Sequence, residues 1–232
     1  MALDKKTFRT RTITAIVFAA VMLLGLFTNV WAFLALFFII MVGCLVEYVK
    51  LVFRFRPMLL FFGVFYAVMP LLMIIDLGVD GTLFASGEKG DSHVSDVFTP
   101  LLPCAIIFSI WINDTMAYLV GSMIGKTPFS KISPKKTWEG TLGGAVLCIG
   151  VIAILGASIP VAQTVALKYW VAIATICAIF GTLGDLLESK LKRLAHVKDS
   201  GSFMPGHGGF LDRFDSLLVA APAVWLYVKL YM

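Results

Sequence analysis

Long runs of apolar residues, separated by short polar stretches, occupy most of this 232-residue chain. Each of seven runs can form a helix of about 17 to 25 residues, the length that the hydrocarbon core of a bilayer demands. The pattern therefore predicts an all-α polytopic membrane protein with about seven (six to nine) transmembrane helices. Pro70 and the glycines at 181 and 184 can bend or split their runs. The predicted spans are residues 13–28, 30–49, 58–77, 99–124, 141–159, 169–187 and 217–231.

The composition agrees with this pattern. Hydrophobic residues make up 59% of the chain and charged residues 14%, whereas soluble domains carry about 25% charged residues. This balance leaves no room for a separate soluble domain. The net charge is +5, but the basic residues lie between apolar runs, so we expect no nucleic-acid partner. The cysteines lie within apolar runs at no metal-like spacing and are expected to be buried thiols: Cys44, Cys104, Cys148 and Cys177.

The basic residues also predict an orientation. With the N-terminus in the cytoplasm, 16 of the 19 Lys and Arg residues fall on the cytoplasmic side, as the positive-inside rule requires. The basic N-terminus followed by an apolar run is similar to a signal peptide. No small-residue cleavage site follows it, so we expect a retained first span.

Two carboxylates, Asp114 and Asp185, interrupt apolar runs near their predicted cytoplasmic ends. A charge within a membrane segment costs about 2.5–3.5 kcal/mol and normally needs a partner or a watery cavity. Asp114 is followed at helical spacings of four, three and four by Tyr118, Gly121 and Gly125, so the four residues share one helix face. An acid, a phenol and two glycines on one face predict a close-packed, hydrated seam.

A polar loop over residues 131–140 follows this helix. Its hydroxyl and ammonium groups, with a proline that stiffens the turn, can form a cradle for phosphate oxygens. The same loop can equally be a positive-inside loop with an interfacial tryptophan. The relevant side chains are those of Ser133, Lys135, Lys136, Thr137 and Trp138.

The last polar stretch, residues 189–215, is the strongest signal. It begins on a helix where Ser189 and Lys192 share a face with Asp185. It ends with Asp212 and Asp215, one helical turn apart near a predicted helix N-terminus.

The residue types in this stretch suit a magnesium and phosphate site. Mg²⁺ prefers carboxylate oxygens, typically one or two, together with substrate phosphates. Asp185 and Asp212 can supply these oxygens from two helices, while Lys and Arg bind the remaining phosphate charge. His207 stands between glycines and can be a general acid, a phosphate contact or a turn residue.

Residues 189–215 resemble the signature of the phosphatidate cytidylyltransferases, also called CDP-diacylglycerol synthases. The signature reads Ser-x-apolar-Lys-Arg, then Lys-Asp-x-small, then His-Gly-Gly-apolar-x-Asp-Arg-apolar-Asp, and every polar position is filled at the right spacing. Two upstream blocks, 114–121 and 133–140, are also similar. Met204 and Ser122 depart from the pattern: the first change is apolar, and the second replaces an arginine of many members. The resemblance is specific over 113–216.

The resemblance implies the reaction CTP + phosphatidate → CDP-diacylglycerol + pyrophosphate, with Mg²⁺ and a second cation such as K⁺. It implies a metal centre at Asp185 and Asp212 in a polar cavity at the cytoplasmic side. The implied catalytic residues are Asp185, Asp212, Asp114, Lys192, Arg193 and His207. The implied substrate-binding residues are Ser133, Lys135, Lys136, Thr137, Ser189, Lys198, Asp199, Arg213 and Asp215.

The resemblance also implies a homodimer in a bacterial-type cytoplasmic membrane. Residues 1–97 would form N-terminal anchoring spans with a possible dimer contact, and residues 98–232 a catalytic membrane domain. Two alternatives remain. One is a related CTP-dependent lipid enzyme, a polyprenol kinase or a CDP-archaeol synthase. The other is an ion-coupled transporter, which should place its charges near the bilayer midplane.

Overall fold

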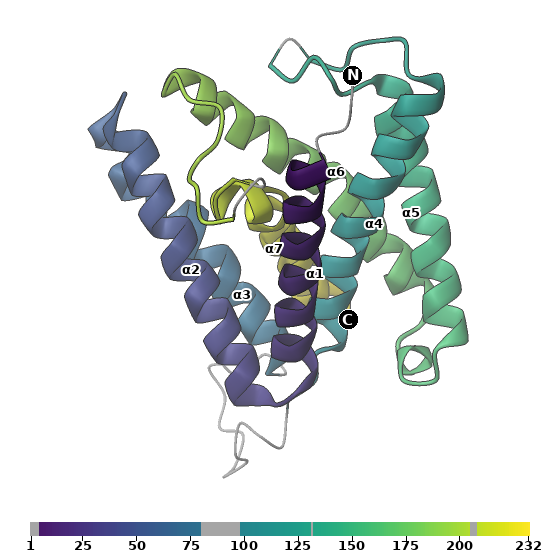
Figure 1. Cartoon of the computed structure of the whole chain (residues 1–232). Coiled ribbons are helices and arrows are strands. Elements are labelled where there is room, and N and C mark those ends of the chain that lie inside the picture. Colours follow the sequence, from purple (N-terminus) through teal and green to yellow (C-terminus); the bar gives the residue numbers. More distant parts are fainter. Residues whose placement is uncertain (1–4, 80–97, 131, 205–207) are drawn as a thin grey trace. The chain divides into compact units, whose positions relative to one another are not determined.

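The computed structural model describes residues 5–79, 98–130, 132–204 and 208–232, with the side chains of residues 5–8 excluded. Helices dominate these residues (Figure 1). The α-helices are α1 (Lys5–Phe27), α2 (Val30–Phe53), α3 (Met69–Gly78), α4 (Leu101–Ile124), α5 (Trp138–Ser158), α6 (Leu167–Leu194) and α7 (Leu211–Tyr231). Shorter helical segments are η1 (Pro57–Phe61), η2 (Val64–Val68) and η4 (Ala162–Thr164).

The prediction of an all-α membrane protein is confirmed. Within the described residues, seven helical stretches are long and apolar enough to cross a bilayer, and each coincides with a predicted span. The last two helices are longer than predicted. α6 continues to Leu194, and α7 begins at Leu211, six residues before the predicted start at 217. The glycines at 181 and 184 do not split α6.

The third span is broken. It starts as the 3-10 segment η1, passes through the π-helical segment η2 and becomes α-helical only from Met69. Pro70 lies in the first turn of α3, where its missing N–H is tolerated because the first N–H groups of a helix have no intrahelical acceptor. A proline at this point therefore sets where the regular helix begins.

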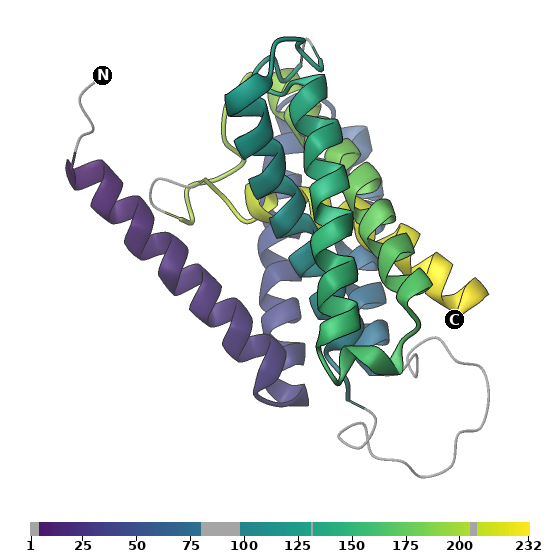
Figure 2. The ribbon, with the colours of Figure 1, turned by 90° about the vertical axis from the view of Figure 1, so that its right-hand side faces the viewer.

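By their contacts, the residues form two compact units: Met1–Pro100 with Leu191–Phe214 (unit 1), and Leu101–Lys190 with Asp215–Met232 (unit 2). In unit 1, α1 and α2 are joined by a tight turn. The Asn29 side chain caps α2 by accepting from the Ala32 N–H at 2.9 Å, which satisfies one of the unpaired N–H groups of the helix start. Figure 2 shows α1 diverging from α2 beyond this turn.

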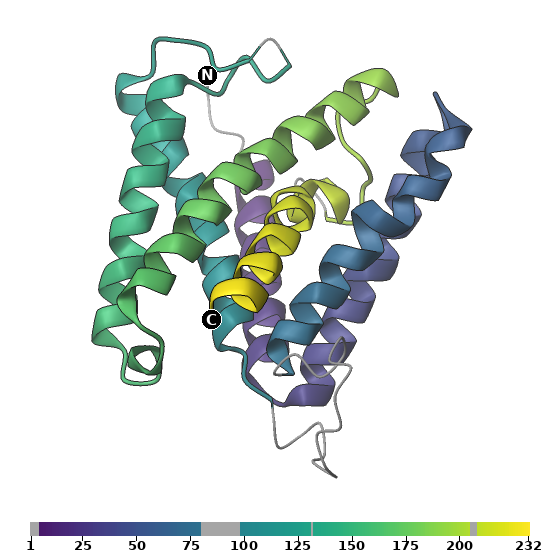
Figure 3. The same ribbon diagram turned by 180° about the vertical axis from the view of Figure 1, so that it is seen from behind.

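Unit 2 contains α4, α5, most of α6 and most of α7. α4 and α5 run side by side in all three ribbon views (Figures 1–3). α7 lies beside α6 (Figure 3), and Gly184 makes this approach possible. A Cβ on Gly184 would lie 2.5 Å from the backbone oxygen of Asp215, closer than real Cβ atoms come.

Candidate functional site

Hydrogen bonds join the two ends of the loop between α4 and α5. The Trp138 N–H donates to the Thr127 carbonyl at 2.9 Å, and the Phe129 N–H donates to the Lys136 carbonyl at 2.8 Å. The Glu139 carboxylate accepts from the Thr127 N–H and hydroxyl at 3.2 and 2.8 Å. These bonds keep the described ends of the loop close to the start of α5.

This loop forms one wall of a pocket of about 480 Å³, which we call the α4–α6 pocket. The other walls come from α4, the start of α5 and α6. Its lining combines carboxylates, hydroxyls and lysines, in keeping with the predicted phosphate cradle. The lining residues are Asn113, Asp114, Ala117, Tyr118, Gly121, Ser122, Ser133, Lys135, Lys136, Thr137, Gly140, Thr141, Thr182 and Asp185.

Close packing of α4 against α5 forms the floor of the pocket. A Cβ on Gly140 would lie 2.7 Å from the Ala117 carbonyl oxygen, and a Cβ on Gly144 would lie 2.6 Å from the Ala117 nitrogen. Gly121 packs against the Thr137 hydroxyl. The predicted close-packed seam at Gly121 is therefore present, and glycines of α5 contribute to it as much as those of α4.

Asp114 lies within α4, which continues for ten residues beyond it to Ile124, where the predicted span 99–124 also ends. Asp114 and its neighbour Asn113 both line the α4–α6 pocket. Asp114 is exposed, so its place in the pocket wall fits the cavity that a carboxylate in a membrane span needs.

Asp185 of α6 is held by two side chains. One carboxylate oxygen forms an ion pair with the Lys136 ammonium, and the other accepts from the Ser189 hydroxyl at 3.2 Å. The Asp185 and Lys136 side chains are 31% and 28% exposed. This pair joins two of the three predicted blocks, because Lys136 belongs to the loop and Asp185 to the helix that opens the last polar stretch.

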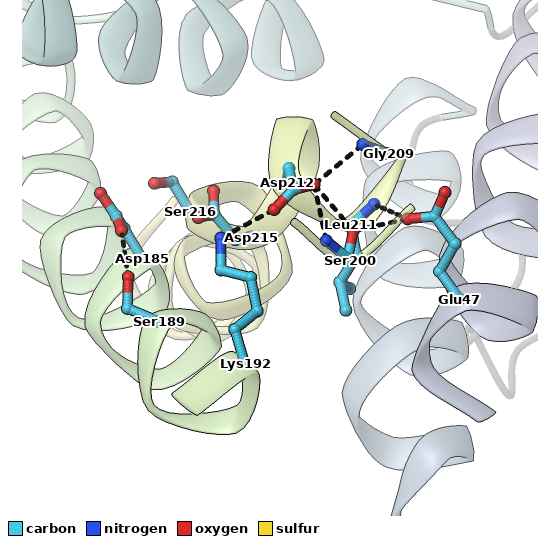
Figure 4. A network of polar contacts seen from close by, with 10 residues as sticks. All are labelled: Glu47, Asp185, Ser189, Lys192, Ser200, Gly209, Leu211, Asp212, Asp215 and Ser216. Atoms are coloured by element: carbon cyan, nitrogen blue, oxygen red, sulfur yellow. Dashed lines mark hydrogen bonds and ion pairs between the residues drawn. The ribbon is translucent and has the colours of Figure 1, made fainter. Parts of the chain in front are cut away.

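In unit 1, Asp212 occupies a cradle of N–H donors at the start of α7 (Figure 4). Its Oδ2 accepts from the Ser200 N–H at 2.9 Å and the Gly209 N–H at 2.8 Å. Its Oδ1 pairs with Lys192 Nζ at 2.7 Å. The Asp212 side chain is only 7% exposed. We call Asp212 with Lys192, Ser200 and Gly209 the Asp212 cradle.

Gly208 completes this cradle by its conformation. Its φ of 86° lies in the left-handed region, which glycine adopts without steric cost. A Cβ at this position would also lie 2.4 Å from Asp212 Oδ2. The glycines of the signature therefore let the backbone approach the carboxylate closely.

Glu47 was not predicted from the sequence. This residue of α2 is buried, and its Oε2 accepts from the Ser200 hydroxyl at 2.7 Å and the Leu211 N–H at 2.9 Å (Figure 4). The signal was available, because Glu47 is a carboxylate inside an apolar run, like Asp114 and Asp185. Glu47 lies outside residues 113–216, over which the resemblance is specific, so no motif singled it out.

The remaining predicted residues are placed less specifically. Asp215 Oδ1 accepts from the Ser216 N–H at 2.6 Å. Several predicted substrate or catalytic residues are exposed, so their assigned roles stay predictions: Arg193, Lys198, Asp199 and Arg213. His207 lies outside the described residues.

The predicted metal ligands can be tested for chemical fit. Among the described residues, no group of three or more His, Cys, Asp or Glu side chains is arranged to hold a metal ion. Asp185 and Asp212 still fit Mg²⁺ as single carboxylate donors, because Mg²⁺ usually binds one or two carboxylates and keeps water and phosphate ligands. A lysine ammonium accompanies each carboxylate, which marks both as sites where positive charge is stabilised. The metal assignment stays a prediction.

Known proteins resemble about half of the chain or more. Phosphatidate cytidylyltransferase 5, chloroplastic, of Arabidopsis thaliana is 44% identical over 128 residues, 55% of this chain and 31% of the relative. Phosphatidate cytidylyltransferase of Bacillus subtilis is 44% identical over 125 residues, 53% of this chain and 45% of the relative. That of Synechocystis is 41% identical over 149 residues, 61% and 48% of the two chains. The matches thus span less than half the length of these relatives.

The sequence model of the Cytidylyltransferase family matches residues 56–231. The match includes both lysine–aspartate pairs, Lys136–Asp185 and Lys192–Asp212, and all of α4 to α7. It begins after Glu47. The chain belongs to the Cytidylyltransferase family.

Proposed function

We propose that this protein transfers CMP from CTP to phosphatidate and so forms CDP-diacylglycerol and pyrophosphate in phospholipid biosynthesis. The observation that carries the proposal is the α4–α6 pocket, where a tied loop brings Ser133, Lys135 and Lys136 to the carboxylate of Asp185. The names of the relatives give the substrate class, since each is called a phosphatidate cytidylyltransferase.

The transfer is a substitution at phosphorus. An oxygen of the phosphatidate phosphate attacks the α-phosphorus of CTP, the bond from this phosphorus to the bridging oxygen breaks, and pyrophosphate leaves. Catalysis of this kind depends on positioning and on neutralising phosphate charge. Lys136 lies in the pocket as a donor to phosphate oxygens, and its pairing with Asp185 holds it there.

Mg²⁺, with K⁺ as a second cation, is the proposed cofactor. Asp185 and Asp212 would hold the Mg²⁺, which neutralises charge on the triphosphate. On phosphate binding, Lys136 and Lys192 would turn from these carboxylates to the phosphate oxygens, which are equally good acceptors for an ammonium. Asp114 would keep the deep end of the pocket hydrated.

The location follows from the substrates. Phosphatidate is a membrane lipid and CTP is water-soluble, so a pocket lined both by membrane helices and by a polar loop suits both. We place the N-terminus and the loop between α4 and α5 in the cytoplasm, from the distribution of basic residues. A homodimer is the proposed assembly.

A substrate panel tests the proposal. Purified protein in lipid nanodiscs is incubated with α-labelled CTP, Mg²⁺ and one acceptor: phosphatidate, an archaeal ether-lipid phosphate or a polyprenol. We expect labelled CMP in lipid with phosphatidate only, and none with Asp185→Asn. Turnover of another acceptor with none of phosphatidate would refute the proposal, as would ion-coupled solute uptake by proteoliposomes without any CMP transfer.

A further inference from the structure

Glu47 is a buried carboxylate on α2, and a helix that only anchored the protein would not need one there. It is 8% exposed and lies toward the C-terminal end of α2, between Val46 and Tyr48. A carboxylate in a membrane span is costly unless it has partners. Its partners, Ser200 and Leu211, lie 153 and 164 residues further along the chain. Both lie in the signature segment: Ser200 precedes Gly201, and Leu211 lies two residues after Gly209.

The backbone of the signature segment packs directly onto the Glu47 carboxylate. A Cβ on Gly201 would lie 2.2 Å from Oε1, and a Cβ on Gly209 would lie 2.1 Å from Oε2. One turn earlier on α2, Gly43 accommodates the Phe210 ring, since a Cβ there would lie 2.5 Å from the ring. One face of α2 is therefore shaped to receive this segment.

Glu47 is linked to Asp212 through two short connections. The Ser200 hydroxyl lies 2.7 Å from Glu47 Oε2 and 3.0 Å from Asp212 Oδ2, while the Ser200 N–H donates to Asp212. A hydroxyl has one proton to donate, and the shorter distance is to Glu47. The Leu211 N–H, in the residue before Asp212, donates to the same Oε2. Glu47 thus holds Ser200, which donates to Asp212, and it also holds the backbone N–H of Leu211, the residue next to Asp212.

We infer that Glu47 is a positioning residue, which acts through Ser200 and Leu211 to hold the Asp212 carboxylate in place for catalysis. This inference deepens the proposed function and rests on it. It lies outside the segment that matches the family, which begins at residue 56. The α1–α2 part of the chain would then support the site as well as anchor it.

Two variants separate positioning from simple packing. Both hydrogen bonds go to Oε2, so Glu47→Gln can keep them by placing its carbonyl oxygen there. Glu47→Leu keeps similar bulk and loses both. A packing role in a membrane span predicts that Leu is tolerated at least as well as Gln. The matched control is Tyr48→Phe, which removes an adjacent α2 hydrogen bond, to the Leu59 carbonyl at 3.0 Å, away from the cradle.

The experiment measures kcat for CMP transfer and hydrogen exchange at the Ser200, Gly209 and Leu211 amides. We expect Glu47→Leu to lower kcat by about tenfold or more, as the loss of a hydrogen bond to a charged group implies, and to speed exchange at all three amides. Glu47→Gln should stay within about threefold of the wild type, and Tyr48→Phe should match it. Wild-type kcat and exchange in Glu47→Leu would overturn the inference.

Two safeguards keep the outcome clear. If Glu47→Leu does not fold, Ser200→Ala replaces it, because it removes the hydroxyl link and leaves α2 intact. Its expected effect is slower turnover with faster exchange at Gly209, and no change in either would overturn the inference. If the wild type makes no CDP-diacylglycerol, the proposed function fails, while exchange in the variants still decides whether Glu47 positions the Asp212 segment.

Discussion

Asp185 in the α4–α6 pocket and Asp212 in its cradle are both carboxylates paired with a lysine, but they are held in different ways. Among the described residues, the side chains of Lys136 and Ser189 hold Asp185, and the Lys136–Asp185 pair is about one-third exposed. Two backbone N–H groups hold Asp212 in addition to Lys192 and the Ser200 hydroxyl, and its side chain is 7% exposed. Asp212 therefore keeps two backbone donors when its lysine turns to a ligand, whereas Asp185 depends on side chains that a ligand can displace.

This difference separates stability from activity. Exposed ion pairs contribute little to stability, while removing one member of a buried pair leaves an uncompensated charge and is costly. Both aspartates are proposed to act in CMP transfer, but only Asp212 should also matter for folding. Substitutions at the two sites should therefore differ in what they impair, and the largest combined effect is expected at Asp212.

Asp212→Asn should impair both properties. An asparagine offers one carbonyl oxygen, so it cannot accept from both the backbone donors and Lys192. We expect kcat to fall by about a hundredfold or more, and the free energy of unfolding to fall by about 2–4 kcal/mol because Lys192 loses its buried partner. Steady-state turnover and denaturant unfolding in detergent measure the two effects. Near-normal turnover at ordinary Mg²⁺ would remove Asp212 from the proposed metal centre.

Asp185→Asn should impair activity alone. We expect a similar loss of kcat, about a hundredfold, with the free energy of unfolding lowered by less than about 1 kcal/mol because the Lys136 pair is partly exposed. The same two assays apply. If this variant were destabilised as much as Asp212→Asn, the contrast between an adjustable and a fixed carboxylate would be wrong.

Lys136→Met should weaken nucleotide binding. We expect the KM for CTP to rise by about tenfold, the change that follows from losing one charge-assisted hydrogen bond to phosphate. Lys126→Met is the matched control, since Lys126 is exposed in the same loop and does not line the pocket. An equal rise in KM for both variants would point to general electrostatic attraction instead of a specific contact.

Gly209→Ala tests how closely the cradle is packed. Its Cβ would meet Glu47 Oε2, and we expect the free energy of unfolding to fall by about 1–3 kcal/mol from this overpacking. Gly150→Ala in α5 is the comparison, because no atom lies within 4 Å of its Cβ position. It should be neutral or stabilise by up to about 1 kcal/mol through helix propensity. Equal unfolding midpoints for Gly209→Ala and Gly150→Ala would show that the cradle accommodates the added methyl group without loss of stability.

The sequence predicted the fold well because a bilayer constrains it strongly. Each span needs about 20 apolar residues, and seven such runs are visible along the chain. Helix ends were less accurate, since polar residues such as Lys192 and Asp212 belong to helices that continue past the apolar run. For the third span, the sequence predicted only that Pro70 can bend or split it. The 3-10 and π segments were not predicted, because such segments have no distinct apolar period.

The site was predicted in part. The acids Asp114 and Asp185 line one pocket with four loop residues, as their carboxylate, hydroxyl and ammonium groups indicated: Ser133, Lys135, Lys136 and Thr137. Glu47 could not be paired with Ser200 or Leu211 from local patterns, since more than 150 residues separate them. Likewise, spacing alone could not show that two backbone N–H groups, those of Ser200 and Gly209, hold Asp212 together with its side-chain partners.

The most direct test of the proposed activity follows both products of one reaction. Wild-type protein in nanodiscs that contain phosphatidate receives CTP and Mg²⁺, and lipid-linked CMP and free pyrophosphate are measured together over time. We predict that both appear at equal rates, only when phosphatidate is present, and at least about a hundredfold more slowly in Asp185→Asn. Release of pyrophosphate without lipid-linked CMP, or equal turnover by Asp185→Asn, would contradict the assignment of CMP transfer to this pocket.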